Sequence, residues 1–145
     1  MSQENAARQP SPVEVLCCWT EAFNEGDYET TLALTADDIE YHELEGMPGA
    51  RGMAGVYNGK DDVTRWFIEF LGGWESGFRN DPVETTELED GRVLRVERWR
   101  GRGLKSAVEV EMSAVGLYTV RDGKVTCCRY FKTKAKALEA VRLSE

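Results

Sequence analysis

The chain has 145 residues, of which 30% are charged and 41% are hydrophobic, and its formal net charge is −8. This length and composition are typical of one globular domain that buries its own core. The negative charge argues against a protein that binds nucleic acid or an anionic membrane, because such a protein needs a net basic face. We therefore expect a single domain over residues 11–145 with neither kind of partner.

The first ten residues are mostly polar, and we expect them to form a disordered tail. They contain no apolar stretch typical of a secretory signal. No window of the chain approaches the ~20 apolar residues of a membrane span. We therefore expect a cytoplasmic protein.

The four cysteines form two adjacent pairs, Cys17–Cys18 and Cys127–Cys128. They have no CxxC spacing, and the single histidine, His42, lies far from one pair along the chain. This pattern predicts small buried side chains in a reducing compartment, with no metal and no cofactor.

Helix signals dominate the first half of the chain. Ser11 and Glu14 can form a capping box around Pro12, and apolar residues then follow at helical spacing as far as Phe23. A Gly-Asp step ends this helix and begins the next. Besides this first helix, the expected elements are helices over Tyr28–Leu34 and Lys60–Leu71, a strand over Ile39–Leu44 and a loop over Gly46–Gly59.

Alternation of apolar and polar residues replaces helical spacing in the second half. Asp-Gly steps at 90–91 and 122–123 indicate hairpin turns. Helices followed by a run of hairpin strands predict an α+β fold with the helices on one face of an antiparallel sheet. The expected strands cover Phe78–Glu87, Arg92–Arg102, Lys105–Val120 and Lys124–Lys132, and a short helix covers Thr133–Leu143.

Glu43 is the first candidate for chemistry. It alternates with Ile39 and Tyr41, so the three share one strand face, and Ile39 indicates that this face is the interior. A carboxylate in such a place can act as a general base. The alternative is a strand with two solvated sides, in which Glu43 lies at the wet end.

Arg95 and Glu97 are the second candidate, because alternation places them on one face together with Trp99. On an interior face they would form a buried pair that orients a water molecule or a substrate. The alternative is a solvated basic strand whose charges are neutralised by Glu109 and Glu111 on the next strand. Basic residues with an interleaved Trp99 also look like a nucleic-acid surface, which the net charge disfavours.

Several stretches between residues 11 and 143 carry a family resemblance, namely 22–28, 36–41, the start of the third helix at Gly59, 120–125 and 137–140. With the order of elements, they resemble the nuclear transport factor 2-like superfamily, and specifically its SnoaL-like, ketosteroid-isomerase-related branch. The resemblance implies a cone in which a strongly curved antiparallel sheet wraps three helices of the N-terminal half around an internal pocket. It also implies a homodimer through the outer sheet face, with which the alternating Val108 and Val110 agree.

The resemblance to the isomerases of this branch points to Glu43. Their catalytic carboxylate lies on the first strand, five positions after an Asp-Asp turn, and this count from Asp38 reaches Glu43. Their oxyanion-donating tyrosine corresponds to Trp19, and their second donor falls near Gly116. Because both donors are missing, the resemblance does not extend to steroid isomerisation.

Limonene epoxide hydrolase is a second relative by resemblance. Its Arg-x-Asp pair looks like Arg95 and Glu97, and its water-binding tyrosine looks like Tyr41. Its asparagine corresponds to Glu43 and its last-strand aspartate to Arg129, so the set that activates water is incomplete.

These observations predict an enzyme that performs acid/base chemistry, of the isomerase, cyclase or hydrolase type, on an apolar cyclic or polyketide-like molecule. Glu43 would abstract the proton, while Tyr41, Arg95 and Glu97 would orient or polarise the substrate. The alternative is a non-catalytic module of the same fold that binds a ligand or another protein. The expected pocket residues are Trp19, Trp66, Trp99 and Arg129, and no metal site is expected.

Overall fold

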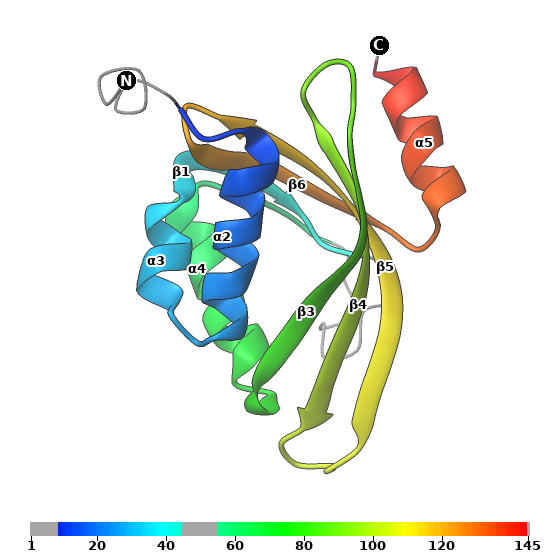
Figure 1. Cartoon of the computed structure of the whole chain (residues 1–145). Helices are drawn as coiled ribbons and strands as arrows, with labels where there is room; N and C mark the ends of the chain where they lie inside the picture. The colour runs from blue at the N-terminus through cyan, green and yellow to red at the C-terminus, as the bar shows by residue number, and fades with distance from the viewer. Residues whose placement is uncertain (1–8, 45–54, 145) are drawn as a thin grey trace.

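The computed structural model describes residues 9–44 and 55–144 (Figure 1). Most of the expected N-terminal tail and most of the expected 46–59 loop lie outside these residues. The helices are α2 (Pro12–Asn24), α3 (Tyr28–Ala33), α4 (Lys60–Leu71) and α5 (Lys134–Leu143). The strands are β1 (Thr35–His42), β2 (Val56–Asn58), β3 (Trp74–Glu87), β4 (Val93–Gly103), β5 (Glu109–Arg121) and β6 (Lys124–Phe131).

Helix α2 begins as its capping signals predict. The Ser11 side chain accepts a hydrogen bond from the Glu14 N–H at 3.1 Å, and the Glu14 carboxylate accepts one from the Ser11 N–H at 3.3 Å. The buried side of α2 carries Leu16 and Trp19. Cys17 and Cys18 lie on the other side and are exposed, so the prediction that they are buried is wrong.

The sheet has six strands in the order β2-β1-β6-β5-β4-β3. Strands β3 to β6 pair antiparallel in sequence, as predicted. Strand β1, however, pairs parallel with β6, so the sheet is mixed rather than purely antiparallel. Most of the chain separates these two strands, and so no hairpin turn forces them to run in opposite directions.

Several element boundaries differ from those expected. Strand β2 forms within the expected 46–59 loop and pairs antiparallel with β1, with Tyr57 opposite Tyr41. Its three residues are too few for alternation to reveal a strand. Strand β3 begins before Phe78, because a bulge with Gly77 at φ +86° lets it continue from Trp74.

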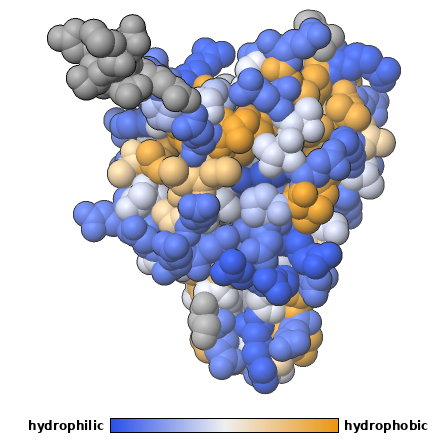
Figure 2. Space-filling model, viewed as in Figure 1, coloured by the Kyte–Doolittle hydropathy of each residue, from blue (hydrophilic) through white to orange (hydrophobic). Residues whose placement is uncertain are grey.

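The sheet curls around α2, α3 and α4, and α5 packs against its opposite face (Figure 1). Beneath α5, Ala137 closes a small core with Leu94, Val115 and Leu117. The face of the molecule seen in Figure 2 is mainly hydrophilic, with hydrophobic residues in separate patches. None of the helices in the described ranges has the length and apolar character needed to cross a membrane. Because the sheet curls around the three helices, a functional site is expected in the space that the sheet encloses.

Candidate active site

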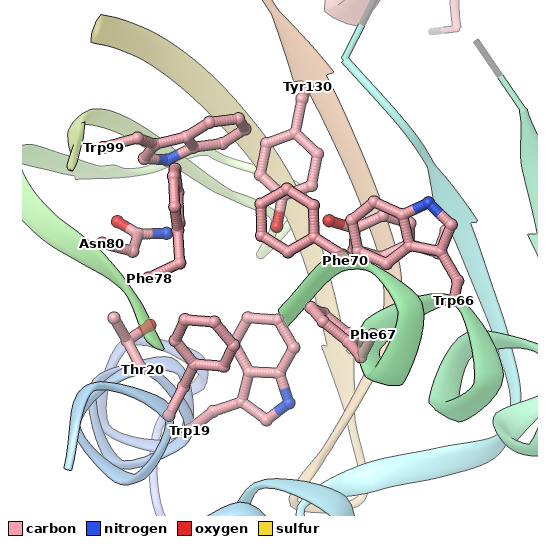
Figure 3. A pocket seen from close by; sticks show the side chains of 11 residues that line it. Trp19, Thr20, Trp66, Phe67, Phe70, Phe78, Asn80, Trp99 and Tyr130 are labelled. Carbon is pink, nitrogen blue, oxygen red and sulfur yellow. The ribbon is translucent and has the colours of Figure 1, made fainter. Parts of the chain in front are cut away.

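A cavity of about 40 Å³ lies between the helices and the inner face of the sheet (Figure 3). Nine of its eleven lining residues are aromatic, and the other two are Thr20 and Asn80. Figure 3 shows the rings of Phe70, Phe78 and Tyr130 arranged around this space. The lining offers a ligand aromatic surfaces and only a few polar groups.

Three of the four expected pocket residues line this cavity. Trp19 comes from α2, Trp66 from α4 and Trp99 from β4, and Tyr41 of β1 joins them. Arg129 is not among the lining residues, which corrects that prediction. On β6, Tyr130 lines the cavity, so alternation turns Arg129 to the other face, where its guanidinium lies 5.4 Å from the centre of the Phe131 ring.

Glu97 is fully buried behind the cavity wall, and both of its oxygens are occupied. Oε2 accepts hydrogen bonds from Arg95 Nε at 2.7 Å and from the Tyr118 hydroxyl. Oε1 accepts from Trp99 Nε1 at 2.8 Å and from Asn80 Nδ2 at 3.0 Å. Because Trp99 and Asn80 line the cavity, this carboxylate fixes the orientation of two wall residues without lining the cavity itself.

Arg95 is also buried and does not line the cavity. Its guanidinium donates to Thr20 Oγ1 at 2.8 Å and lies 5.0 Å from the centre of the Tyr118 ring. Burial by itself would lower the pKa of Arg95, but the neighbouring Tyr118 and Glu97 hold this pKa above its ordinary value. The two side chains form a buried ion pair, which is hydrogen-bonded to the cavity-lining residues Thr20, Asn80 and Trp99.

The other face of β4 explains the basic stretch of the sequence. Arg98 and Arg100 are exposed and form ion pairs across the sheet, with Glu111 at 3.2 Å and Asp81 at 2.6 Å. The strand thus has a solvated basic face and a buried face that carries Arg95 and Glu97. The expected buried pair and the expected solvated basic strand are therefore both present, on opposite faces of β4.

Three tyrosines lie beside the Glu97 carboxylate or in the cavity wall, and of these Tyr41 and Tyr118 are buried and Tyr130 is partly buried. Tyr41 and Tyr130 line the cavity, and the Tyr118 hydroxyl lies 3.3 Å from that of Tyr130. Burial raises the pKa of all three well above the ordinary value. Their hydroxyl groups therefore keep their protons over the physiological range and can donate hydrogen bonds.

Gly116 makes room for one of these tyrosines. A Cβ at this position would lie 2.5 Å from the Tyr118 ring. The resemblance places a second oxyanion donor near Gly116, and the structure places the phenol of Tyr118 there instead. The indole of Trp19 does not replace the first donor, because its Nε1 donates to Thr35 Oγ1 at 3.0 Å.

Glu43 follows the end of β1 and is 7% exposed, so the face that it shares with Tyr41 is interior as predicted. Its Oε2 accepts long hydrogen bonds from the Gly55 N–H at 3.3 Å and the Tyr57 hydroxyl at 3.4 Å. Its Oε1 is buried and has no hydrogen-bond partner among residues 9–44 and 55–144. Glu43 does not line the cavity, but the Tyr57 ring lies 5.8 Å from that of Trp66 in the cavity wall.

Asn80 is a lining residue that the sequence analysis missed. Its backbone is held to α2 by Asn24, which accepts from the Asn80 N–H at 2.9 Å and donates to the Asn80 carbonyl at 2.6 Å. Its side-chain Oδ1 is buried and finds no donor within the described part of the chain. Alternation with Phe78 on the expected strand was the signal that could have identified it.

The family model of the SnoaL-like domain matches residues 18–128. No curated protein matches the chain significantly.

Solved structures of the same fold cover most of the chain. TerC, co-crystallised with polyporic acid, is 24% identical, with a TM-score of 0.70 over 90% of this chain and 97% of its own. A Mycobacterium tuberculosis protein in complex with estradiol-17beta-hemisuccinate is 19% identical, with a TM-score of 0.73 over 87% and 97%. A Mesorhizobium loti protein assigned as a SnoaL-like polyketide cyclase is 26% identical, with a TM-score of 0.59 over 84% and 99%.

The curled sheet, the three helices inside it and the family match agree with one another. The likeness to the first two structures concerns the fold alone, since fewer than a quarter of the residues are identical. The chain therefore belongs to the SnoaL-like family, within the nuclear transport factor 2-like fold.

Proposed function

We propose that the protein is an enzyme that transfers a proton at a carbon atom beside the carbonyl group of a small cyclic molecule, with Glu43 as the general base. The buried Oε1 of Glu43, which has no hydrogen-bond partner among the described residues, carries this proposal. A general base needs a lone pair that no hydrogen bond occupies, in a place that contains little water. Oε1 of Glu43 has such a lone pair, because no described residue donates to it. Glu97 is a poorer candidate, because four donors already occupy its two oxygens.

The proposed step is an enolisation. Oε1 of Glu43 takes the proton, and the C–H electron pair forms a C=C bond to the carbonyl carbon. The carbonyl π electrons move onto the oxygen, which becomes negatively charged. The phenols of Tyr41 and Tyr130 line the cavity and can donate hydrogen bonds to that oxygen. The protonated Glu43 then returns the proton. In an isomerisation the proton goes to a different carbon of a conjugated enolate. In a cyclisation the enolate carbon first forms a bond to a second carbonyl carbon of the same molecule, and the proton goes to the alkoxide that this bond creates.

Asn80 and the buried pair behind it have supporting roles in this proposal. Asn80 Oδ1 can accept a hydrogen bond from a hydroxyl group of the substrate, because its Nδ2 is held by Glu97. Arg95 and Glu97 are positioning residues, since they fix Thr20, Asn80 and Trp99 without lining the cavity.

A cyclic substrate needs more room than the cavity of about 40 Å³ provides. An apolar hollow of about 210 Å³ lies beside it, between α2, α3 and α4. Phe23 and Phe67 line both spaces, with ring centres 5.8 Å apart. We infer that rotation of these two rings joins the spaces, and that displacement of Trp66 opens the enlarged cavity toward Glu43.

The ligands of similar proteins support the substrate class. Polyporic acid and estradiol-17beta-hemisuccinate, bound by two structures of this fold, are both ring compounds. A cyclic, mainly apolar substrate also fits a lining made chiefly of aromatic rings.

A non-catalytic ligand-binding module is the second candidate, and the position of Glu43 outside the lining favours it. Turnover of a panel of activated cyclic ketones separates the two. The enzyme proposal predicts that Glu43→Gln lowers kcat by about 10²–10⁴-fold. Asp38→Asn, which changes an exposed carboxylate of the same strand, leaves kcat unchanged. Tight binding without turnover, or a Glu43→Gln variant with full turnover, contradicts the catalytic assignment.

A homodimer and a cytoplasmic location remain predictions. Of the two valines expected on the outer face, Val108 is 57% exposed, whereas Val110 packs inward against the core. Helix α5 also covers part of the outer face. Sedimentation at micromolar concentration tests the dimer, and a monomeric mass contradicts it.

A further inference from the structure

The outer face of β1 and β6 brings together three residue types that bind metals and that the candidate active site does not use. Glu40 and His42 alternate on β1, and Cys127 lies on β6, where it is the register partner of Glu40. One ligand atom of each residue lies within 4.8 Å of the other two. His42 and Cys127 are far apart along the chain, and the parallel pairing of β1 with β6 brings them onto neighbouring strands.

Two of the three separations between these atoms are close to those of a tetrahedral metal site. His42 Nε2 lies 3.0 Å from Glu40 Oε2, and Cys127 Sγ lies 3.8 Å from the same oxygen. Tetrahedral bonds of about 2.0–2.3 Å to zinc place neighbouring ligand atoms roughly 3.3–3.6 Å apart. These two separations therefore need to change by only a few tenths of an ångström, while the third is within 4.8 Å.

The His42 side chain is directed at the other two residues. It is 29% exposed, and its Nε2 lies 3.0 Å from Glu40 Oε2. This nitrogen makes no well-directed hydrogen bond with any described residue. A divalent ion between the three side chains would bind Nε2, the Glu40 carboxylate and the Cys127 thiolate together.

We propose that Glu40, His42 and Cys127 bind a zinc-type divalent cation. A thiolate, an imidazole and a carboxylate together are a donor set for zinc, whereas magnesium and calcium prefer oxygen ligands alone. Three protein ligands leave the fourth position to a water molecule or an external ligand. The ion would fasten β1 to β6 on the face opposite to the cavity, because Tyr41 between Glu40 and His42 points into the cavity.

The positive charge of Arg129 beside the three ligands affects how tightly a metal ion can bind. Arg129, the register partner of His42, lies on the same outer face of β6 as Cys127, and its guanidinium is placed over Phe131. A cation beside the cluster weakens the binding of a metal ion, so we expect an affinity below that of a four-ligand structural zinc site.

Titration of the full-length, reduced, metal-free chain with cobalt(II) tests the proposal. We expect one cobalt per chain, a thiolate-to-cobalt charge-transfer band in the near ultraviolet and the visible bands of tetrahedral cobalt. Zinc should displace the cobalt and abolish these bands, while magnesium should leave them unchanged. Absence of the charge-transfer band overturns the proposal.

Variants identify the ligands. Cys127→Ser should abolish the charge-transfer band. Glu40→Gln and His42→Gln, which change partly exposed side chains, should each weaken cobalt binding by at least about tenfold. Cys17→Ser is the matched control, because Cys17 is an exposed cysteine away from the cluster. A band that survives Cys127→Ser, or that is lost in Cys17→Ser, contradicts the assignment. The outcome is independent of the proposed function, because Glu43→Gln should bind cobalt like the wild type.

Discussion

Glu97 in the middle of β4 and Glu43 just after β1 are both buried carboxylates, but their surroundings are opposite. Four donors surround Glu97, including the Arg95 guanidinium at 2.7 Å. Glu43 accepts two long hydrogen bonds on one oxygen and has none from the described residues on the other. Burial alone therefore does not distinguish a carboxylate that holds the fold together from one that can react.

The difference follows from where each residue lies on its strand. Glu97 pairs with Pro82 on β3 and Ala114 on β5. Side chains from further along the same three strands, Asn80, Arg95 and Tyr118, reach its carboxylate and donate to it. Glu43 lies at the end of the paired region, where, among the described residues, its donors come from the short strand β2 and the residue before it. A strand end thus leaves a lone pair available that a strand centre does not.

Removal of Glu97 should have the largest effect on stability. Glu97→Ala leaves the Arg95 charge buried without its partner, which typically costs about 3–5 kcal/mol of unfolding free energy. Glu111→Ala breaks the exposed pair with Arg98 and should cost about 1 kcal/mol or less. Urea unfolding of both variants measures the difference. Similar losses in the two variants would contradict the structural role of Glu97.

Gly116→Ala should have an intermediate effect on the same region. The new Cβ would meet the Tyr118 ring at 2.5 Å and push its hydroxyl away from Glu97, and overpacking of this kind costs roughly 1–3 kcal/mol. The control is Gly73→Ala, where the nearest atom to a Cβ is a backbone oxygen at 3.5 Å. Thermal unfolding compares the two, and an equally stable Gly116→Ala variant would show that Tyr118 can shift at no cost.

Alkaline pH should weaken the Glu97 region through its tyrosines. Their pKa values are raised in the folded protein, so their contribution to stability is complete below the unfolded tyrosine pKa of about 10 and is lost as pH rises above it. Each such tyrosine adds up to ~1.4 kcal/mol of lost stability per pH unit. Tyr130→Phe should therefore flatten the decline measured by urea unfolding at several alkaline pH values. An unchanged slope would mean that Tyr130 ionises equally in both states.

Local signals predicted the helices correctly and placed Arg95, Glu97 and Trp99 on one face of β4, but they left open whether that face is interior or solvated. The capping box at Ser11 acts within one turn of the chain, and the alternation of Arg95, Glu97 and Trp99 follows from the pleat of a single strand. Trp19, Trp66 and Trp99 could be expected in the cavity, because large aromatic residues on inward faces must fill or line the enclosed space.

The same local signals cannot predict which distant strands pair. The parallel contact of β1 with β6, and with it the meeting of Glu40, His42 and Cys127, depends on how the sheet closes rather than on any local pattern. Arg129 was carried over from a relative by position along the chain, and alternation beside Tyr130 contradicts that transfer. The unpartnered oxygen of Glu43 depends on the sheet geometry at the end of β1, which its own sequence does not specify.

Solvent exchange of the proton beside the carbonyl group tests the central claim most directly. An activated cyclic ketone is incubated with the protein in deuterated buffer, and loss of its proton signal is followed by nuclear magnetic resonance. We predict that the wild type and Asp38→Asn catalyse the exchange, and that Glu43→Gln, folded as judged by circular dichroism, slows it by about 10²-fold or more. Exchange by Glu43→Gln at the wild-type rate would contradict the assignment of the open carboxylate as the base.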